Sequence, residues 1–285
     1  SDKFEEVSPK VDLTKGTDYT ITEPTETKGG IFKVALTNAG IQKLAKLETD
    51  KGDAKNQAGF EGKLLRVEFK TTINEDAIMG KPIPNNVELK YGHTPDANGS
   101  TKPKNPPTVE TGGKRFLKYD SDNETRKLAG AKFVVKNAND EYLFEDKNGN
   151  YVWEKVDNAT PEKLKKLTKD GKEASTPEPD KYLKVLTSGA DGAFEIKGLE
   201  YGIVKSGDKY VAEGRDYWLR EIEAPVVDGI KYALKDGEIK FTVDDKSYYK
   251  DPSKIELGTT AGDADPLKID NKKITIPQTG GMGTM

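Results

Sequence analysis

One carboxylate in this sequence stands where a strand should present apolar side chains. Alternate residues of a strand share one face, so Glu221 and Glu223 fall on the same side as Tyr217 and Leu219. That side faces the protein interior, where a carboxylate is costly unless it is paired or takes part in chemistry. Glu221 therefore stands where a carboxylate needs a specific reason. The alternative, a strand end that carries solvated acids, stays open at this point.

The residue types that carry most enzyme chemistry are rare or absent. The chain has no cysteine, which excludes disulfide bonds, thiolate metal sites and cysteine nucleophiles. Its one histidine, His93, stands in a loop rich in glycine and proline and has no second imidazole with which to form a common zinc site. The acidic run Asp120–Glu124 lacks the glycine and the final glutamate of an EF-hand, so we interpret it as a solvated turn. We expect no cofactor and no metal.

The C-terminal segment holds the most specific short motif. Ile276-Pro277-Gln278-Thr279-Gly280 matches the LPxTG-type signal of sortase transpeptidases, with isoleucine in place of leucine. Such a signal must be extended and accessible, because the Thr279–Gly280 peptide bond has to reach an external cysteine. The simple alternative is a frayed chain end. The apolar span and basic tail that should follow the signal are missing, which we attribute to truncation.

Composition is that of a folded protein with a thin core. Of the 285 residues, 33% are apolar and 33% are charged, against usual shares of about 45–50% and about 25%. The 46 basic and 49 acidic residues nearly cancel, and 23 aromatic residues are spread along the chain, so disorder is not implied. No basic face suited to nucleic acid, no membrane span and no signal peptide stand out.

Short alternating segments predict a mainly β fold. Leu65–Ile73 has the period of a half-buried strand, and many similar segments follow it. Three dipeptides predict tight hairpin turns: Asn148-Gly149, Asp191-Gly192 and Asp236-Gly237.

Helix is scarce in the predicted fold. We expect one short surface helix over about 38–47 and another after Thr160-Pro161. Residues 92–113 are rich in proline, glycine and threonine and predict an interdomain linker. Many short strands with few helices are typical of β-sandwiches.

Four motifs, in the right order, resemble those of the CnaB-type domains of Gram-positive surface proteins. They are the E-box Tyr217–Pro225, the first strand Gly113–Asp120 with the LAGAxF segment Leu128–Val135, the DGxFxIxGL stretch Asp191–Leu199, and the last strand Asn271–Pro277. Together they cover about 114–281, so the chain is similar to the C-terminal part of a streptococcal-type, sortase-assembled backbone pilin. A weaker resemblance to the preceding pilin domain extends over 1–105.

The resemblance implies an intramolecular isopeptide bond between Lys118 and Asn271, with Glu221 as the proton shuttle. Burial would lower the pKa of the lysine and raise that of Glu221, giving a free amine beside a protonated acid. The amine would attack the Asn271 side-chain carbonyl, which Glu221 polarises, and ammonia would leave. Proximity alone can replace an external enzyme. Lys114 shares the strand face of Lys118 and is the runner-up nucleophile.

For residues 1–105 the resemblance implies no isopeptide bond. Lys90 stands where such a domain can carry the reactive asparagine, and the chain enters at Ser1, after the first strands of the domain. The Tyr-Pro-Lys motif that accepts the sorting signal of the next subunit is also missing. Lys10 and Lys104 only echo its end, so we expect the acceptor lysine to lie outside this chain.

The expected fold is mainly β, with two tandem immunoglobulin-like (Cna-type) β-sandwich domains and one or two short surface helices. The expected parts are an N-terminal sandwich at 1–100, truncated at its start, a linker at 101–113, a CnaB-type domain with the isopeptide bond at 114–275, and the sorting signal and tail at 276–285.

We expect a structural shaft subunit of a covalently polymerised pilus, secreted and anchored to the cell wall. Its partners would be a pilin-specific sortase and neighbouring subunits joined head to tail, with no nucleic acid. It would be no enzyme beyond the autocatalytic formation of its own bond. The alternative is a wall-anchored adhesin or minor pilin that binds a host surface or matrix protein.

Overall fold

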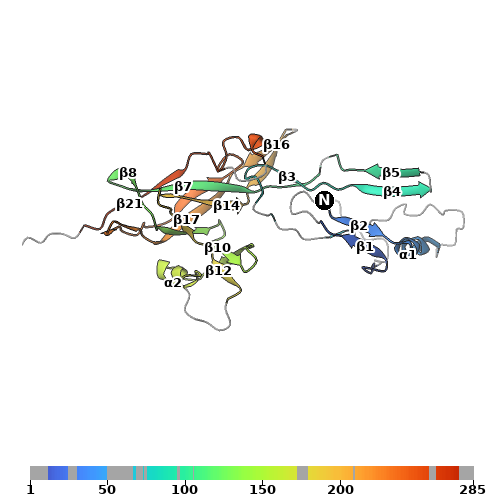
Figure 1. Cartoon of the computed structure of the whole chain (residues 1–285), viewed down its shortest axis with the longest axis horizontal. Helices are drawn as coiled ribbons and strands as arrows, with labels where there is room; N and C mark the ends of the chain where they lie inside the picture. The colour runs from blue at the N-terminus through green and yellow to red at the C-terminus, as the bar shows by residue number, and fades with distance from the viewer. Residues whose placement is uncertain are drawn as a thin grey trace, which may run out of the picture. The chain divides into compact units, whose positions relative to one another are not determined.

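The computed structural model describes residues 12–24, 31–49, 67–68, 73, 76–94, 97–104, 106–171, 179–207, 209–256 and 261–275. The chain divides into two compact units, Ser1–Lys70 and Thr71–Met285 (Figure 1). The strand predicted at 65–73 lies almost entirely outside the described residues. So does the sorting signal at 276–280.

In the first unit, a two-stranded ribbon precedes a helix. Strands β1 (Tyr19–Thr22) and β2 (Lys33–Leu36) pair antiparallel, and α1 (Asn38–Thr49) confirms the first predicted helix. The hydroxyl of Thr37 accepts a hydrogen bond from the Gly40 N–H at 3.2 Å, as an N-cap does. A Cβ at Gly40 would lie 1.9 Å from the Asp18 carbonyl oxygen, so only glycine fits this contact.

The second unit is built on two β-sheets. The larger has the strand order β11 (Tyr151–Lys155), β10 (Glu141–Asp146), β9 (Lys132–Lys136), β17 (Arg215–Glu223) and β20 (Ile239–Val243), with β12 (Lys181–Leu183) on β10 and β13 (Leu186–Thr187) on β9. The smaller has the order β14 (Ala193–Leu199), β7 (Gly112–Asp120) and β21 (Leu267–Asn271), with β8 (Asn123–Lys127) on β7.

The inner faces of the two sheets pack on each other through aromatic rings. Phe194 of the smaller sheet stacks on Phe133 of the larger at 4.9 Å between ring centroids, and Phe116 meets Phe241 edge to face at 5.1 Å. Each ring comes from a position of the alternating strand pattern, which sends every second side chain into the core. The predicted β-sandwich is thus confirmed.

A short helix covers the outer face of the larger sheet. Helix α2 (Pro161–Lys166) begins after Thr160, whose hydroxyl accepts a hydrogen bond from the Lys163 N–H at 3.3 Å. Proline fits the first helical position because it has no N–H to satisfy there. Leu164 is fully buried against the outer face of the sheet, which confirms the second predicted helix. Within the described part of the chain, no helix is long and apolar enough to cross a membrane.

Gly149, Gly192 and Gly237 all have the positive φ that the three predicted turns require, but only one of these turns is a hairpin. Asn148-Gly149 joins β10 to β11, and Gly149 has φ of 81°. The hairpins predicted at Asp191-Gly192 and Asp236-Gly237 are wrong, because the strands on either side of each turn pair with other strands. The first of these turns leads from β13 in the larger sheet to β14 in the smaller. A hairpin that was not predicted joins β18 (Val226–Val227) to β19 (Ile230–Lys231).

Short strands occupy much of the segment for which the sequence predicts a linker. Strands β4 (Leu89–Thr94) and β5 (Ala97–Thr101) form a hairpin, and β3 (Ile83–Pro84) pairs with β6 (Thr108–Val109). The remaining elements are the hairpin of β15 (Gly202–Ser206) and β16 (Lys209–Glu213) and the 3-10 turn η1 (Pro252–Lys254).

Candidate functional site

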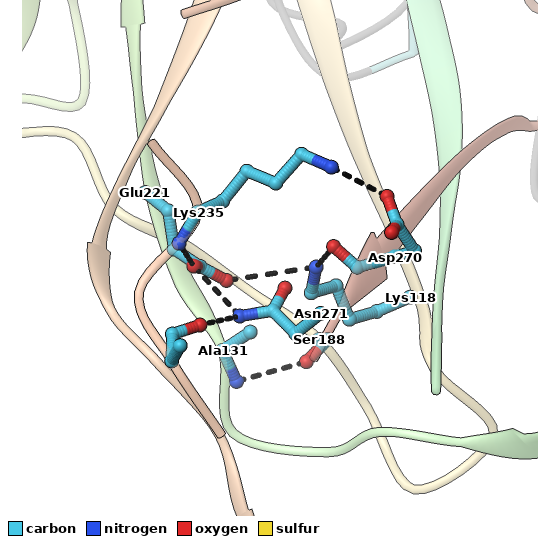
Figure 2. Close-up of polar contacts among 8 residues, drawn as sticks. Lys118, Ala131, Ser188, Glu221, Lys235, Asp270 and Asn271 are labelled. Carbon is cyan, nitrogen blue, oxygen red and sulfur yellow. Dashed lines mark hydrogen bonds and ion pairs between the residues drawn. The ribbon is translucent and has the colours of Figure 1, made fainter. Parts of the chain in front are cut away.

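Three buried polar side chains meet between the two sheets: Lys118, Glu221 and Asn271 (Figure 2). Lys118 comes from β7, Glu221 from β17 and Asn271 from the end of β21, and none is more than 2% exposed. The carboxyl oxygen Oε1 of Glu221 lies 3.6 Å from Lys118 Nζ. The other oxygen, Oε2, accepts a hydrogen bond from Asn271 Nδ2 at 2.9 Å. The structure therefore brings together the three residues that the sequence selects.

Strand register aims these side chains at one another. On β7, Phe116, Lys118 and Asp120 alternate inward, and β21 runs parallel to β7 with Ile269 opposite Lys118. Asn271 follows two residues later and shares the inward face with Ile269. Glu221 reaches the same space from the facing sheet, so the parallel pairing of β21 with β7 determines which asparagine meets the lysine.

The placement predicted for Glu223 is wrong. Its strand was expected to keep Glu221 and Glu223 on one face, but the pairing of β17 with β9 shifts register between these residues. The β-bulge breaks the alternation. Half-buried Glu223 pairs with Lys132 at 3.2 Å and with Lys165 of helix α2. One strand thus carries a buried carboxyl and a solvated one two residues apart.

Burial governs the protonation of the pair. Removal from water lowers the pKa of Lys118 to about 8, although the neighbouring Glu221 opposes this shift. Burial likewise raises the pKa of Glu221, against the influence of Lys118 and of the hydrogen bonds that the carboxyl accepts. Both shifts favour the neutral forms, an amine with a free lone pair and a carboxylic acid. Lys118 Nζ also lies 5.6 Å from the centre of the Phe133 ring.

Glu221 contacts both nitrogens that a condensation would involve. Its Oε2 accepts from Asn271 Nδ2 and, at 2.5 Å, from the backbone N–H of Lys235. Its Oε1 faces Lys118 and has no hydrogen-bond partner among the described residues. Asn271 Nδ2 donates a second bond to the Ala233 carbonyl at 2.7 Å, while its Oδ1 is buried without a partner in the described part of the chain.

Sequence reasoning missed the residues that surround this trio. The Lys118 amine donates to the Asp270 carbonyl at 2.9 Å, and the Asp270 carboxylate pairs with Lys235 Nζ at 2.5 Å. Lys235 lies in the loop after β19, and no local pattern signals that its backbone meets Glu221. Beside the site is a cavity of about 340 Å³, lined by Ala233, Leu234, Lys235, Asp236, Asp270, Asn271 and Lys272.

The runner-up nucleophile lies apart from the trio. Lys114 is half-buried opposite Ile196, and four residues of strand separate it from Lys118, or about 13 Å. In the described part of the chain it makes no hydrogen bond or ion pair with Glu221. Of the weak acceptor candidates, Lys104 is exposed and Lys10 lies outside the described residues, as does the side chain of His93.

A second buried carboxylate, that of Asp120, lies close to the trio. Asp120, two residues after Lys118, is fully buried and accepts from the Tyr232 hydroxyl at 2.9 Å, the Asp122 N–H at 2.9 Å and Lys273 Nζ at 3.0 Å. Burial alone would raise the pKa of Asp120, but these hydrogen bonds and the Lys273 charge lower it. The predicted solvated turn thus begins with a buried anchor that ties β7 to the chain after Asn271.

No protein family model matches the sequence, and no curated protein matches it. Among solved structures, the 35 kDa C-terminal fragment of the major pilin GBS80 of Streptococcus agalactiae is 33% identical, with a TM-score of 0.56 over 91% of this chain and 78% of that chain. The full-length RrgB pilus protein of Streptococcus pneumoniae is 25% identical over 70% of this chain and 38% of that chain, with a TM-score of 0.36. The major pilin subunit BcpA of Bacillus cereus is 20% identical over 69% of this chain and 40% of that chain, with a TM-score of 0.35.

The β-sandwich and the 33% identity define the chain as a structural protein of the pilin class. It belongs to the backbone, or major, pilins of Gram-positive bacteria. The chain spans 38% of full-length RrgB, so it corresponds in length to part of that pilin.

The Asp120 anchor predicts a specific effect of removing one hydroxyl. Tyr232→Phe should lower the free energy of unfolding by about 1.5–3 kcal/mol, because the buried carboxylate loses a donor. Urea unfolding followed by fluorescence measures this change. Tyr151→Phe is the matched control, since the hydroxyl of half-buried Tyr151 makes no hydrogen bond with the described residues. Equal losses of stability in the two variants would contradict a stabilising role of the hydrogen bond from Tyr232 to Asp120.

Proposed function

We propose that this chain is part of a pilus shaft subunit whose C-terminal domain, at 114–275, closes an isopeptide bond between Lys118 and Asn271 without an external enzyme. The contact of Glu221 with both nitrogens carries this proposal. Membership of the backbone pilins supports the shaft role, since such proteins are structural and belong to the cell surface.

The reaction exchanges one amine for another on the Asn271 side chain. The Lys118 Nζ–Asn271 Cγ bond forms and the Cγ–Nδ2 bond breaks. One proton must move from Nζ to Nδ2, which leaves as ammonia. Oε1 of Glu221 faces the nitrogen that loses the proton and Oε2 contacts the nitrogen that gains it, so one carboxyl can accept on one side and donate on the other.

This geometry changes one detail of the mechanism expected from the sequence. Glu221 was also expected to polarise the Asn271 carbonyl, but its contact is with the amide nitrogen. We therefore assign Glu221 to proton transfer alone. The cavity beside Asn271 is bordered by the exposed residues Leu234 and Asp236, and it offers ammonia a short way to solvent.

The position of the bond suits a subunit that carries tension. Strand β7 begins the sandwich and β21 ends it, so the link would join the two ends of the domain directly. A load applied along the chain would pass from Gly112 to Lys118, across the bond and out through Asn271. The residues between would carry none of it, and β7 and β21 could not be pulled apart.

The segment before the sorting signal is held to the domain. The Ile274 N–H donates to the Lys231 carbonyl at 3.0 Å, and the Ala233 N–H donates to the Lys272 carbonyl at 2.8 Å. We propose that a pilin-specific sortase cleaves after Thr279 and joins this threonine to a lysine of the neighbouring subunit. The product would be a covalent head-to-tail polymer, secreted and anchored to the cell wall.

Intact mass tests the isopeptide bond directly. The purified chain should weigh about 17 Da less than its summed sequence, because one ammonia leaves. Lys118→Ala, Asn271→Ala and Glu221→Ala should each restore the full mass. Lys114→Ala is the matched control and should keep the loss. A full mass for the unmodified chain, or a restored mass for Lys114→Ala alone, would refute the assignment.

Stability provides an independent measure of the same bond. Asn271→Ala should lower the free energy of unfolding by about 5 kcal/mol, because the link closes a loop of about 150 residues and restricts the unfolded chain. Thermal melting and trypsin resistance both report this loss. Lys114→Ala keeps both linked residues and is the matched control. Melting of Asn271→Ala at the temperature of the unmodified chain would count against the link.

Sortase processing has its own signature. Incubation with a pilin-specific sortase and a small amine should release residues 280–285 and leave the amine on Thr279, since the enzyme resolves its acyl intermediate with any accessible nucleophile. Mass spectrometry of the C-terminal peptide identifies this product. Thr279→Ala should abolish it, whereas Thr284→Ala should leave it unchanged. Cleavage at another bond would refute the proposed site.

A further inference from the structure

An ion pair borders the reaction site on its solvent side. Lys235 Nζ lies 2.5 Å from Asp270 Oδ1, and the two side chains are 34% and 31% exposed. Figure 2 shows the Lys235 side chain reaching from the Glu221 side of the site to Asp270. The same two residues contact the reacting groups through their backbones, since the Asp270 carbonyl accepts from Lys118 and the Lys235 N–H donates to Glu221.

The charge of the Lys118 amine depends on the side chains that face it from the surrounding elements. Strand β17 contributes Glu221, and β9 contributes only the uncharged ring of Phe133. Strand β21 contributes Asp270, and the loop after β19 contributes Lys235. Asp120, the next inward residue of β7, is already bound by Tyr232 and Lys273. Lys235 and Asp270 are thus the charges near the amine that take no direct part in proton transfer.

We propose that the Lys235–Asp270 ion pair controls the charge that Lys118 carries before the bond forms, and thereby the pH range in which the domain links itself. Both are positioning residues. This inference rests on the isopeptide reaction proposed above. While paired, the two charges largely cancel at the Lys118 amine. Without Lys235, the free carboxylate of Asp270 would hold the lysine as an ammonium ion, which cannot attack.

Loss of the other partner has the opposite effect. Without the Asp270 charge, Lys235 would stand unpaired near the amine and repel its proton. The causes of the lowered Lys118 pKa agree with this scheme: burial lowers it most, Glu221 opposes, Lys235 lowers it further and Asp270 raises it. Because the reaction needs the neutral Lys118 amine, the rate of bond formation should rise with pH through the pKa of Lys118, and it should fall again where Glu221 loses the proton that it donates. The midpoint compared below is that of the rising limb.

The test is the pH profile of bond formation in the full chain. A short cell-free translation pulse is transferred to buffers between about pH 6 and 9.5, quenched in denaturant at intervals, and scored by intact mass. Lys235→Met should move the midpoint of the profile to higher pH, and Asp270→Asn should move it to lower pH. At neutral pH, Lys235→Met should lower the rate of bond formation and Asp270→Asn should raise it, each by about 3–10-fold.

Three further variants separate charge from structure. Lys235→Arg keeps the charge and should keep the unmodified midpoint, and the double variant Lys235→Met with Asp270→Asn should return close to it. Lys181→Met breaks the pair of Lys181 with Glu154, whose side chains are similarly exposed at 35% and 38%, and should change nothing. Equal slowing by Lys235→Met and Asp270→Asn at an unmoved midpoint would overturn the inference.

The two proposals fail in different ways. An unmodified chain that never loses ammonia at any pH would refute the isopeptide reaction itself. An unmodified chain that loses ammonia while Lys235→Met and Asp270→Asn keep its midpoint would refute only the role of the ion pair. If Lys235→Met does not fold, Lys235→Gln replaces it, and the opposite shift in Asp270→Asn still decides the question.

Discussion

The enclosure of a lysine and a glutamate between two packed sheets is the constraint on which this domain depends. Water cannot solvate Lys118 or Glu221, so burial pushes both toward their neutral forms. A neutral amine is a nucleophile and a neutral carboxyl is a proton donor, so the same burial would drive the proposed reaction. The sheets must stay tightly closed for this to hold, which explains why the trio lies next to the aromatic stack that ends at Phe133.

The polar residues around the trio hold β7 and β21 in the register that brings the three side chains together. Asp120, Tyr232 and Lys273 bind one another beside the trio and tie β7 to the chain that leaves β21. Lys235 adds a backbone hydrogen bond to the one carboxyl oxygen of Glu221 that also contacts Asn271. These contacts select how the last strand docks, because a shift of β21 by one residue would turn Asn271 away from the lysine.

Backbone pilins are structural proteins, and the composition of this chain matches that task. Apolar residues make up 33% of it and cysteine is absent, so neither a thick core nor disulfide bonds can hold it against force. A link between the first and last strands of the sandwich would replace both, because it joins the points at which load enters and leaves. The hydrogen bonds of residues 272–274 to the loop after β19 would extend this path toward the sorting signal.

Local sequence patterns determined most strands of the sandwich, the two helices, the Asn148-Gly149 hairpin and, through family motifs, the three residues of the site. These depend on alternation, capping and turn residues that act over a few positions. Only the tertiary structure decided the sheet order, the crossing at Asp191-Gly192, the bulge that separates Glu223 from Glu221, and the roles of Lys235, Asp270 and Asp120. Those contacts join residues far apart in the chain, so they can stabilise the site only once β21 has paired with β7. The sequence alone can name the residues proposed to react, but the environment that would make them react is a property of the folded sandwich.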